Sequence, residues 1–449
     1  MELQNVPVTL EEQSHVSGSM SSIMEPLSHQ NEEFNDTNDA SVAYSYPEGG
    51  SRAWIVVGGA CLTLACTFGM MSTVGVLQTY WEKNQLRGYS SMTVGWIPSL
   101  FVFFNLMLGV QVGPLFDRYG PRLMMLIGSI SYTLSMFLLG SCTKYYQFML
   151  CFSILGGMSS AFISTPTMAS LSHWFHRRRG TATGIAMAGS SVGGTAFPII
   201  LKFSLEKLGW GWSLRLMGFI FLSLLTIGNL CIKGRLPTAS QKSTFDFKCF
   251  SDARFVWITI GAFFTEIVLF ASLGLIPSYA LAQGFGSQTG FYCLAIFNIG
   301  LFNSGSGFGR WLSGLGSDHY GRFNTLAVVM VVTTIFIFVL WFPFGGYIGV
   351  FYPFVATLGF GTGTILSLTP VCVGQICKTD DFGQWYGTCY FIASFGTLVG
   401  IPVGAQLLEV AGPSRLVACL GGFLGLAVLS FVMARWSSLE YHWKWAIKV

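Results

Sequence analysis

Arg310 carries a positive charge within a long run of apolar residues. Two polar residues precede it, Asn303 and Ser306, and two follow it, Ser313 and Ser317. Their spacings of three or four residues place all five on one face of a helix. A charge buried at such depth is costly, so it usually faces a cavity or a partner. This polar face predicts a site for an anionic or polar carbonyl group. The alternative is an arginine whose long stem lets its charged head reach a polar surface.

Glu266 is the only acid that lies deep within an apolar run, among phenylalanine and leucine residues. A carboxyl group in that position can take up and release a proton, or it can stay neutral as a hydrogen-bonded packing residue. Both interpretations stay open, because the sequence contains no distance to Arg310. Asn105 is a further candidate ligand group, although buried amides in apolar segments usually bridge one helix to another.

The composition indicates what surrounds these residues. The chain has 449 residues, of which 52% are hydrophobic and 10% charged, and its mean hydropathy is +0.58. A soluble domain carries roughly 25% charged residues. This composition excludes a soluble enzyme, a nucleic-acid-binding protein and a fibrous protein, and it predicts a chain whose surface faces lipid.

Apolar runs long enough to cross a membrane, about 20 residues each, recur along the chain. We expect twelve helical spans, at residues 53–80, 95–116, 123–141, 148–171, 181–203, 214–232, 255–281, 290–316, 325–344, 348–376, 387–408 and 416–436. They divide the chain into a disordered acidic tail (1–48), a six-helix bundle (49–232), a linker (233–254), a second six-helix bundle (255–436) and a short C-terminal tail (437–449).

Two stretches of sequence repeat each other across the chain. Residues 113–122 read GPLFDRYGPR and residues 314–322 read GLGSDHYGR, so Asp117 and Asp318 are 201 residues apart. The pairs Pro166/Pro370 and Pro198/Pro402 are each 204 residues apart. The repeat predicts an all-α membrane protein of two pseudo-symmetric halves with a site between them.

The two repeated loops are candidates for a conformational latch that holds the halves in one arrangement. Glycine lets helices approach closely, and an Asp at a helix end can pair with a base or cap a facing helix. The candidate latch residues are Gly113, Asp117, Arg118, Gly120, Arg122, Gly314, Asp318, Gly321 and Arg322.

The Lys and Arg residues of the connecting segments and span ends predict the orientation. If both termini are cytoplasmic, 16 of them fall inside and seven outside, which agrees with the positive-inside rule. We therefore expect both termini in the cytoplasm. The expected location of the protein is the plasma membrane.

Other motifs exclude enzyme chemistry. The chain has no phosphate-binding GxxxxGK[ST] loop, and its eleven cysteines have no zinc-site spacing. Residues 189–193, GSSVG, formally match a hydrolase motif, but their apolar surroundings indicate close helix packing. We expect no catalytic residue, no metal, no cofactor and no nucleic-acid partner.

The paired loops resemble the signature of the major facilitator superfamily, over residues 49–435. PEGGSRAW at residues 47–54 and HWFHRRRGTATGIAMAGSSVG at residues 173–193 resemble the two motifs of monocarboxylate porters, in the style of their fungal members. Two features of that family are missing. Residues 69–73 have no lysine, and Ser306 stands where the family has an Asp four residues before the Arg.

The resemblance implies a secondary active transporter that moves a small organic compound by alternating access. We expect a monomer that exports a fungal secondary metabolite, with membrane lipid around it and a co-transported proton as a possible second substrate. Uptake of a monocarboxylate or vitamin-like anion, or nutrient sensing without net flux, stays open.

Overall fold

The computed structural model describes residues 47–235, 247–286, 289–299, 306–378 and 381–442, and the described residues contain helices and no strand. The described residues between 47 and 442 belong to one compact unit. Residues 1–46 of the predicted acidic tail, 236–246 of the predicted linker and 443–449 of the predicted C-terminal tail lie outside the described residues.

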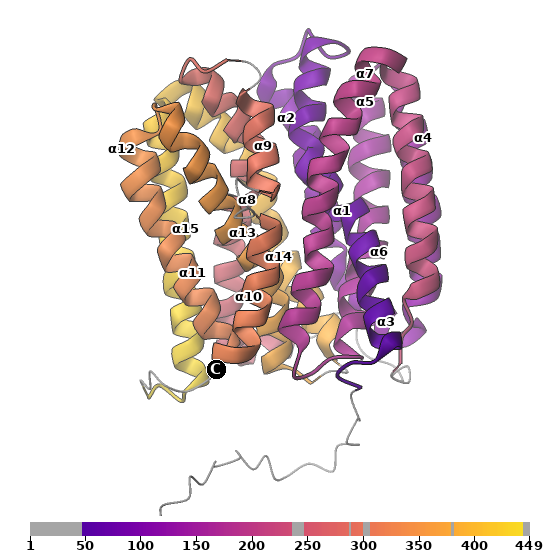
Figure 1. Ribbon diagram of the computed structural model, residues 1–449, viewed down its shortest axis with the longest axis vertical. Helices are drawn as coiled ribbons and strands as arrows, with labels where there is room; N and C mark the ends of the chain where they lie inside the picture. Colours follow the sequence, from indigo (N-terminus) through magenta and orange to yellow (C-terminus); the bar gives the residue numbers. More distant parts are fainter. Residues whose placement is uncertain (1–46, 236–246, 287–288, 300–305, 379–380, 443–449) are drawn as a thin grey trace, which may run out of the picture. The chain divides into compact units, whose positions relative to one another are not determined.

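The first half consists of one set of helices, drawn from indigo to magenta in Figure 1. They are α1 (Ser51–Lys83), α2 (Ser91–Met107), α3 (Gly109–Tyr119), α4 (Pro121–Leu139), α5 (Tyr145–Phe148), a π-helix (Met149–Gly156), α6 (Gly157–Ser172) and α7 (Arg179–Cys231).

The second half lies beside the first and is drawn from pink to yellow (Figure 1). It contains a short 3₁₀ helix (Phe247–Ser251), α8 (Ala253–Ala282), α9 (Thr289–Ile299), α10 (Ser306–Tyr320), α11 (Arg322–Phe336), a π-helix (Ile337–Trp341), α12 (Phe342–Phe344), α13 (Ile348–Ile376), α14 (Phe382–Ala411) and α15 (Pro413–Ser438).

Ten helical segments of the described residues are long and apolar enough to cross a membrane. The difference from the expected twelve has two sources. The 53-residue α7 combines two expected spans, and Gly209, with φ 72°, breaks its helical geometry between them. The expected span 290–316 is divided between α9 and α10, and residues 300–305 lie outside the described part. The count of twelve stays a prediction.

The two repeated loops have the same backbone geometry. Gly120 lies between α3 and α4 with φ 73°, and Gly321 lies between α10 and α11 with φ 100°. Only glycine adopts this left-handed region without strain, so each glycine ends one helix and starts the next within a single residue. The repeat seen in the sequence therefore corresponds to a repeated structural turn.

Small residues let the helices pack closely within and between the halves. Between α1 and α7, a Cβ added at Gly69 would lie 2.9 Å from Cα of Gly193, and one added at Gly189 would lie 2.5 Å from Sγ of Cys61. The GSSVG run is therefore a packing surface, as its apolar surroundings predict. The halves meet mainly where α10 contacts α7 and where α14 contacts α2 and α3.

Candidate functional site

Asp318, near the end of α10, caps the start of α7 in the other half. Its Oδ1 accepts the N–H of Gly180 at 3.0 Å, while Oδ2 accepts the N–H of Thr181 at 2.8 Å and the Thr181 hydroxyl at 2.6 Å. The first N–H groups of a helix have no partner within that helix, and a carboxylate is a strong cap for them. The residue preceding α7, Arg178, makes no side-chain cap of its own. One half thus completes a helix of the other.

Two arginines join the halves near the same helix start. Arg179 of α7 donates from Nη1 to the carbonyl oxygen of Gly374 in α13 at 2.9 Å, and its guanidinium carbon lies 4.3 Å from the ring centroid of Phe382. In the opposite direction, Arg322 donates from Nη2 to the carbonyl oxygen of His176 at 2.8 Å. We call Asp318, Arg322, Arg179 and the residues that they contact the Asp318 cluster.

Glu48, which precedes α1, binds the loop beside this cluster. Its carboxylate accepts the backbone N–H groups of His176, Arg177 and Arg178 at 2.8, 2.6 and 3.1 Å. Burial raises the pKa of this carboxyl, but the three backbone N–H groups outweigh burial and leave the pKa of Glu48 below its usual value. The charged carboxylate therefore holds the loop that leads into α7.

Glycine makes these inter-half contacts possible. A Cβ at Gly113 of α3 would overlap the carbonyl oxygen of Gly383 in α14, and a Cβ at Gly184 of α7 would overlap that of Arg310. A Cβ at Gly314 would lie 2.5 Å from the carbonyl oxygen of Gly180. No larger residue fits at these positions without separating the halves.

Arg310 belongs to α10, and its side chain contacts α7. It is about 12 Å along the helix from Asp318 at 1.5 Å per residue. Only 3% of its surface is exposed. Its Nη1 donates to the carbonyl oxygen of Met187 at 2.8 Å and to the hydroxyl of Ser190, whereas its Nε has no hydrogen-bond partner among the described residues. The guanidinium therefore bonds across the two halves and does not extend to a polar surface.

The other residues of the predicted polar face do not gather around Arg310. Ser306 is fully buried and faces α13, where a Cβ added at Gly363 would lie 2.6 Å from its Oγ. Ser313 donates to the carbonyl oxygen of Arg310, within its own helix. Asn303 lies outside the described residues. The helical spacing is as predicted, but Ser306 and Arg310 point to different neighbouring helices.

Glu266 lies in α8 and is 3% exposed, with no hydrogen-bond partner for Oε2 among the described residues. Tyr386 and Tyr390 of α14 lie close enough to interact with it electrostatically. Glu266 and Arg310, both described, form no ion pair with each other. On α14, the rings of Phe382, Tyr386 and Tyr390 follow one another at centroid distances of 5.5 and 4.7 Å. This aromatic column connects the Arg179 contact with Glu266.

Asn105 bridges three helices of the first half. Its Nδ2 donates to Sδ of Met71 in α1 at 3.6 Å, and its Oδ1 accepts the hydroxyl of Ser164 in α6 at 3.0 Å. This arrangement resembles the helix-to-helix bridging that is usual for buried amides. Its assignment as a substrate ligand stays a prediction.

The latch loop of the first half is engaged differently from that of the second. Arg118 is exposed and lies over its neighbour Tyr119, with 5.0 Å from its guanidinium carbon to the ring centroid. Arg122 is also exposed, whereas Arg322 crosses between the halves. The side chain of Asp117 lies outside the described residues.

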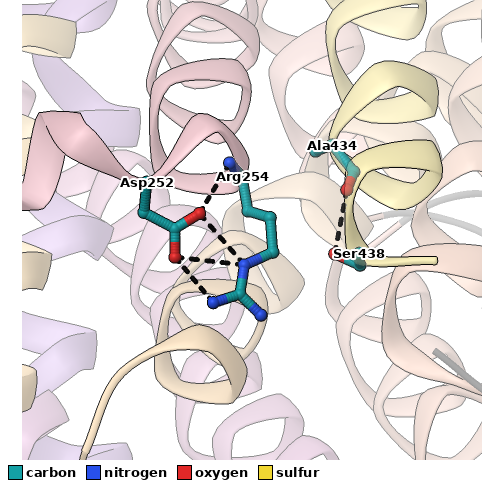
Figure 2. A network of polar contacts seen from close by, with 4 residues as sticks. All are labelled: Asp252, Arg254, Ala434 and Ser438. Carbon is teal, nitrogen blue, oxygen red and sulfur yellow. Dashed lines mark hydrogen bonds and ion pairs between the residues drawn. The ribbon is translucent and has the colours of Figure 1, made fainter. Parts of the chain in front are cut away.

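Asp252 shows what a cap within one half looks like (Figure 2). At the start of α8 its carboxylate accepts the N–H of Arg254 at 2.8 Å and pairs with the same residue's guanidinium at 2.7 Å. The contact joins residues two positions apart, so motion between the halves does not strain it. Nearby in the picture, Ser438 donates to Ala434 within α15 at 2.9 Å.

Comparison with known proteins identifies the family. The profile of the Major Facilitator Superfamily matches residues 59–387, which is most of the chain. The chain belongs to the major facilitator superfamily. It is therefore a multi-pass membrane protein of a transporter family, and the predicted fold class is confirmed.

Relatives within the superfamily come from fungi. The chain is 35% identical to the riboflavin transporter MCH5 of Saccharomyces cerevisiae over 406 residues, covering 85% of this chain and 77% of the relative. It is 34% identical to the aspyridones efflux protein apdF of Emericella nidulans over 397 residues, covering 86% and 80%. The structure of the human organic anion transporter MFSD10 matches with a TM-score of 0.66 at 14% identity, covering 85% of this chain and 99% of that one, and shows the shared fold.

Sequence reasoning missed Arg179 of the Asp318 cluster in this superfamily member, and also Glu48, which holds the loop beside that cluster. Glu48 and Arg179 each stand within a motif that was recognised, PEGGSRAW and the run that begins at His173. The structure shows that these two motifs contact each other through the Glu48 carboxylate. Their joint presence in one chain was the available signal, but their spacing of more than 100 residues did not reveal contact.

Proposed function

We propose that this chain is a secondary active transporter that moves a small organic compound by alternating access. The observation that carries the proposal is the cap of Asp318 on Gly180 and Thr181, because it joins two repeated halves through bonds that can separate. Rocking of one half against the other would break these contacts at one end of the bundle and open a path from the site between the halves.

The strength of these contacts suits a reversible switch. A hydrogen bond to a charged group contributes about 1.5–3 kcal/mol, and a neutral one about 1 kcal/mol. The bonds of Asp318, Arg179, Arg322 and Arg310 therefore favour the closed arrangement by an amount that differential binding of a substrate can offset. Each bond has a partner in the opposite half, so separation of the halves breaks them together.

We assign the Asp318 end to the cytoplasm and both termini with it. The support is the distribution of Lys and Arg over the connecting segments and span ends, 16 against seven. The plasma membrane is the proposed location.

We propose membership of the monocarboxylate porter family within the superfamily. The two motifs that resemble that family contact each other, because Glu48 of the first motif accepts backbone N–H groups of the second. Together they hold the loop that leads into α7. The missing lysine and the Ser306 substitution argue against lactate-type transport in this member.

Export of a fungal secondary metabolite is the direction and substrate class that we favour. The relative named for efflux of aspyridones supports it, as does the low charge of the polar face around Arg310. Uptake of a vitamin-like organic anion is the second candidate, because the riboflavin transporter is also a relative over most of its length. In either case Glu266 is the proposed proton-binding residue, since it is buried and makes no ion pair with Arg310.

Counterflow in proteoliposomes tests the transport proposal. Vesicles preloaded with unlabelled riboflavin should accumulate labelled riboflavin faster than empty vesicles do. Vesicles preloaded with an unlabelled extract of fungal metabolites should likewise accumulate labelled metabolites from the same extract faster than empty vesicles do. Asp318→Asn should slow the exchange, whereas Asp252→Asn, which removes a cap within one half, should not. Saturable binding without counterflow for every compound that binds would instead indicate a sensor.

A further inference from the structure

A basic cavity of about 940 Å³ lies beside the start of α1, away from the inter-half contacts described above. Its lining includes Arg52, Lys233 and Arg235, all exposed, and no Asp or Glu of the described residues lines it. Glu48 is the acid nearest in sequence, but its carboxylate is bound to three backbone N–H groups of the loop before α7. Three basic side chains therefore line this space.

Backbone geometry adds to the positive character of the cavity. The indole Nε1 of Trp174 donates to the carbonyl oxygen of Lys233 at 2.9 Å and so holds the chain that carries Lys233 and Arg235 against the first half. Gly50, at the start of α1, provides no side-chain cap, and Ser51 and Arg52 of the first turn also line the cavity. Their N–H groups belong to the start of α1, where backbone N–H groups have no partner within the helix and favour an anion.

The cavity also has an apolar wall that continues into a second groove. Ile55 is 53% exposed and Leu230 is 73% exposed, and both line the basic cavity. A second cavity of about 530 Å³ shares Leu230 and Lys233 with the first and runs between α4 and the last turns of α7, along Leu126, Ile130 and Leu222. Half of the residues that line this groove are apolar, and no Asp or Glu of the described residues lines it.

The basic and apolar side chains of the two cavities follow one another in the order that an anionic phospholipid requires. A cluster of positive charges at one end meets a strip of exposed apolar side chains that leads along the helices. An anionic phospholipid has a phosphate headgroup followed by acyl chains, and basic pockets between transmembrane helices are known to select such headgroups. A soluble anion would use the basic cavity alone, and only bulk lipid would then cover Ile55, Leu222 and Leu230.

We propose that these two cavities form a binding site for one anionic phospholipid. Its headgroup lies among Arg52, Lys233 and Arg235, and an acyl chain lies in the groove between α4 and α7. Asn229 also lines the groove, and its amide donates to the hydroxyl of Ser129 at 2.8 Å. The site is independent of the proposed transport substrate, because none of these residues belongs to the Asp318 cluster.

Native mass spectrometry of the purified full chain tests the headgroup part. Phosphatidylserine should form adducts at concentrations well below those needed for phosphatidylcholine with the same acyl chains. The variant with Arg52→Gln, Lys233→Gln and Arg235→Gln should lose this preference, with roughly 100-fold weaker phosphatidylserine binding at low salt.

The matched control for charge carries Lys144→Gln, Lys202→Gln and Lys207→Gln, three exposed lysines outside both cavities. It should keep the preference for phosphatidylserine. Equal adducts of the two lipids on the unaltered chain would overturn the proposal. An equal loss in both triple variants would also overturn it, because it would indicate general attraction to positive charge.

A second pair of variants tests the acyl-chain groove and separates a lipid from a free phosphate. Leu222→Trp should fill the groove and weaken phosphatidylserine binding several-fold, whereas Ile227→Trp, at an exposed residue of α7 that does not line it, should not. Glycerophosphoserine, which has the same headgroup and no acyl chains, should bind at least 10-fold more weakly than the lipid. Binding of glycerophosphoserine as tight as that of the lipid, or no effect of Leu222→Trp, would overturn the proposal.

Discussion

The carboxylate of Asp318 and the first turn of α7 at Thr181 are joined by two hydrogen bonds, although 137 residues separate them in the chain. The two residues belong to different halves of the repeat. An aspartate near the end of a helix in one half thus caps a helix in the other, and the bond to Gly180 extends the same contact. This relationship makes the start of α7 sensitive to any separation of the halves.

Asp318→Asn should weaken the contact between the halves while leaving membrane insertion intact. An amide lacks the charge and has one acceptor oxygen where the carboxylate has two, and a hydrogen bond to a charged group contributes about 1.5–3 kcal/mol. We expect slower transport and faster amide hydrogen exchange at Gly180 and Thr181, measured by mass spectrometry of peptides from the start of α7. Asp252→Asn should change exchange only at the start of α8. Unchanged exchange at Thr181 would contradict the role of the cap.

Gly113→Ala should prevent close approach of α3 and α14. The added methyl group would overlap the carbonyl oxygen of Gly383, so the helices must separate there. Forcing an extra methyl group into a packed contact costs about 1–3 kcal/mol, so we expect transport to fall about 10-fold at equal membrane abundance. Gly58→Ala is the control, since a Cβ there meets no atom within 4 Å. Equal activity of the two variants would show that this contact does not limit transport.

Arg310→Ala should abolish transport, and Arg310→Lys should retain part of it. Alanine removes the guanidinium hydrogen bonds to the carbonyl oxygen of Met187 and the hydroxyl of Ser190, at a cost of about 1–3 kcal/mol. Lysine keeps the charge but lacks the planar guanidinium fork. Initial rates of counterflow measure both effects, with Lys202→Ala as an exposed control. Full activity of correctly inserted Arg310→Ala would rule out an essential role.

Glu266→Gln should remove the pH dependence of transport, because the amide cannot take up a proton. The groups that face Glu266 from α14 are Tyr386, Cys389 and Tyr390. Arg310 makes no ion pair with it, so the stability losses of Glu266→Gln and Arg310→Ala should add within about 0.5 kcal/mol in the double variant. Transport rates at several pH values and thermal unfolding measure the two effects. A persistent pH dependence in Glu266→Gln would exclude this residue as the proton site.

His173 should make the folded protein less stable as the pH falls. Burial, and then the charge of Arg179, lower the pKa of His173 from 6.5 to about 4, so its ring is neutral in the folded chain at pH 6. The unfolded chain binds a proton more readily, so stability is lost as the pH falls from about 6.5 to about 4. His173→Gln should reduce this loss in thermal unfolding, whereas the exposed His442→Gln should not. Parallel pH profiles for all three proteins would contradict this assignment.

The positions of the spanning helices could be predicted closely. Residues 348–376 were expected as one span, and α13 covers Ile348–Ile376. Lipid requires apolar runs of a certain length, so hydrophobicity alone marks them. The turns at Gly120 and Gly321 were also visible as repeated glycines, because a left-handed backbone between two helices selects glycine.

The contacts of the candidate site could be predicted only in part. A cap by Asp318 on a facing helix was one of two expected roles, and the structure shows that role with Gly180 and Thr181. The shared face of Ser306 and Arg310 was expected to serve one ligand, yet the two side chains contact α13 and α7 respectively. Positions four residues apart differ in angle by enough to meet different neighbours once several helices surround α10.

The sequence by itself determined that the chain lies in a membrane as two repeated halves, since those properties follow from hydrophobic length and from the distance between like motifs. Only the tertiary structure decided that Glu48 holds the loop before α7, and that Arg179 and Arg322 cross between the halves in opposite directions. Helical periodicity gives the direction in which a side chain leaves the axis of its own helix. Its partner depends on which distant helix packs against that face, and packing is a property of the whole bundle.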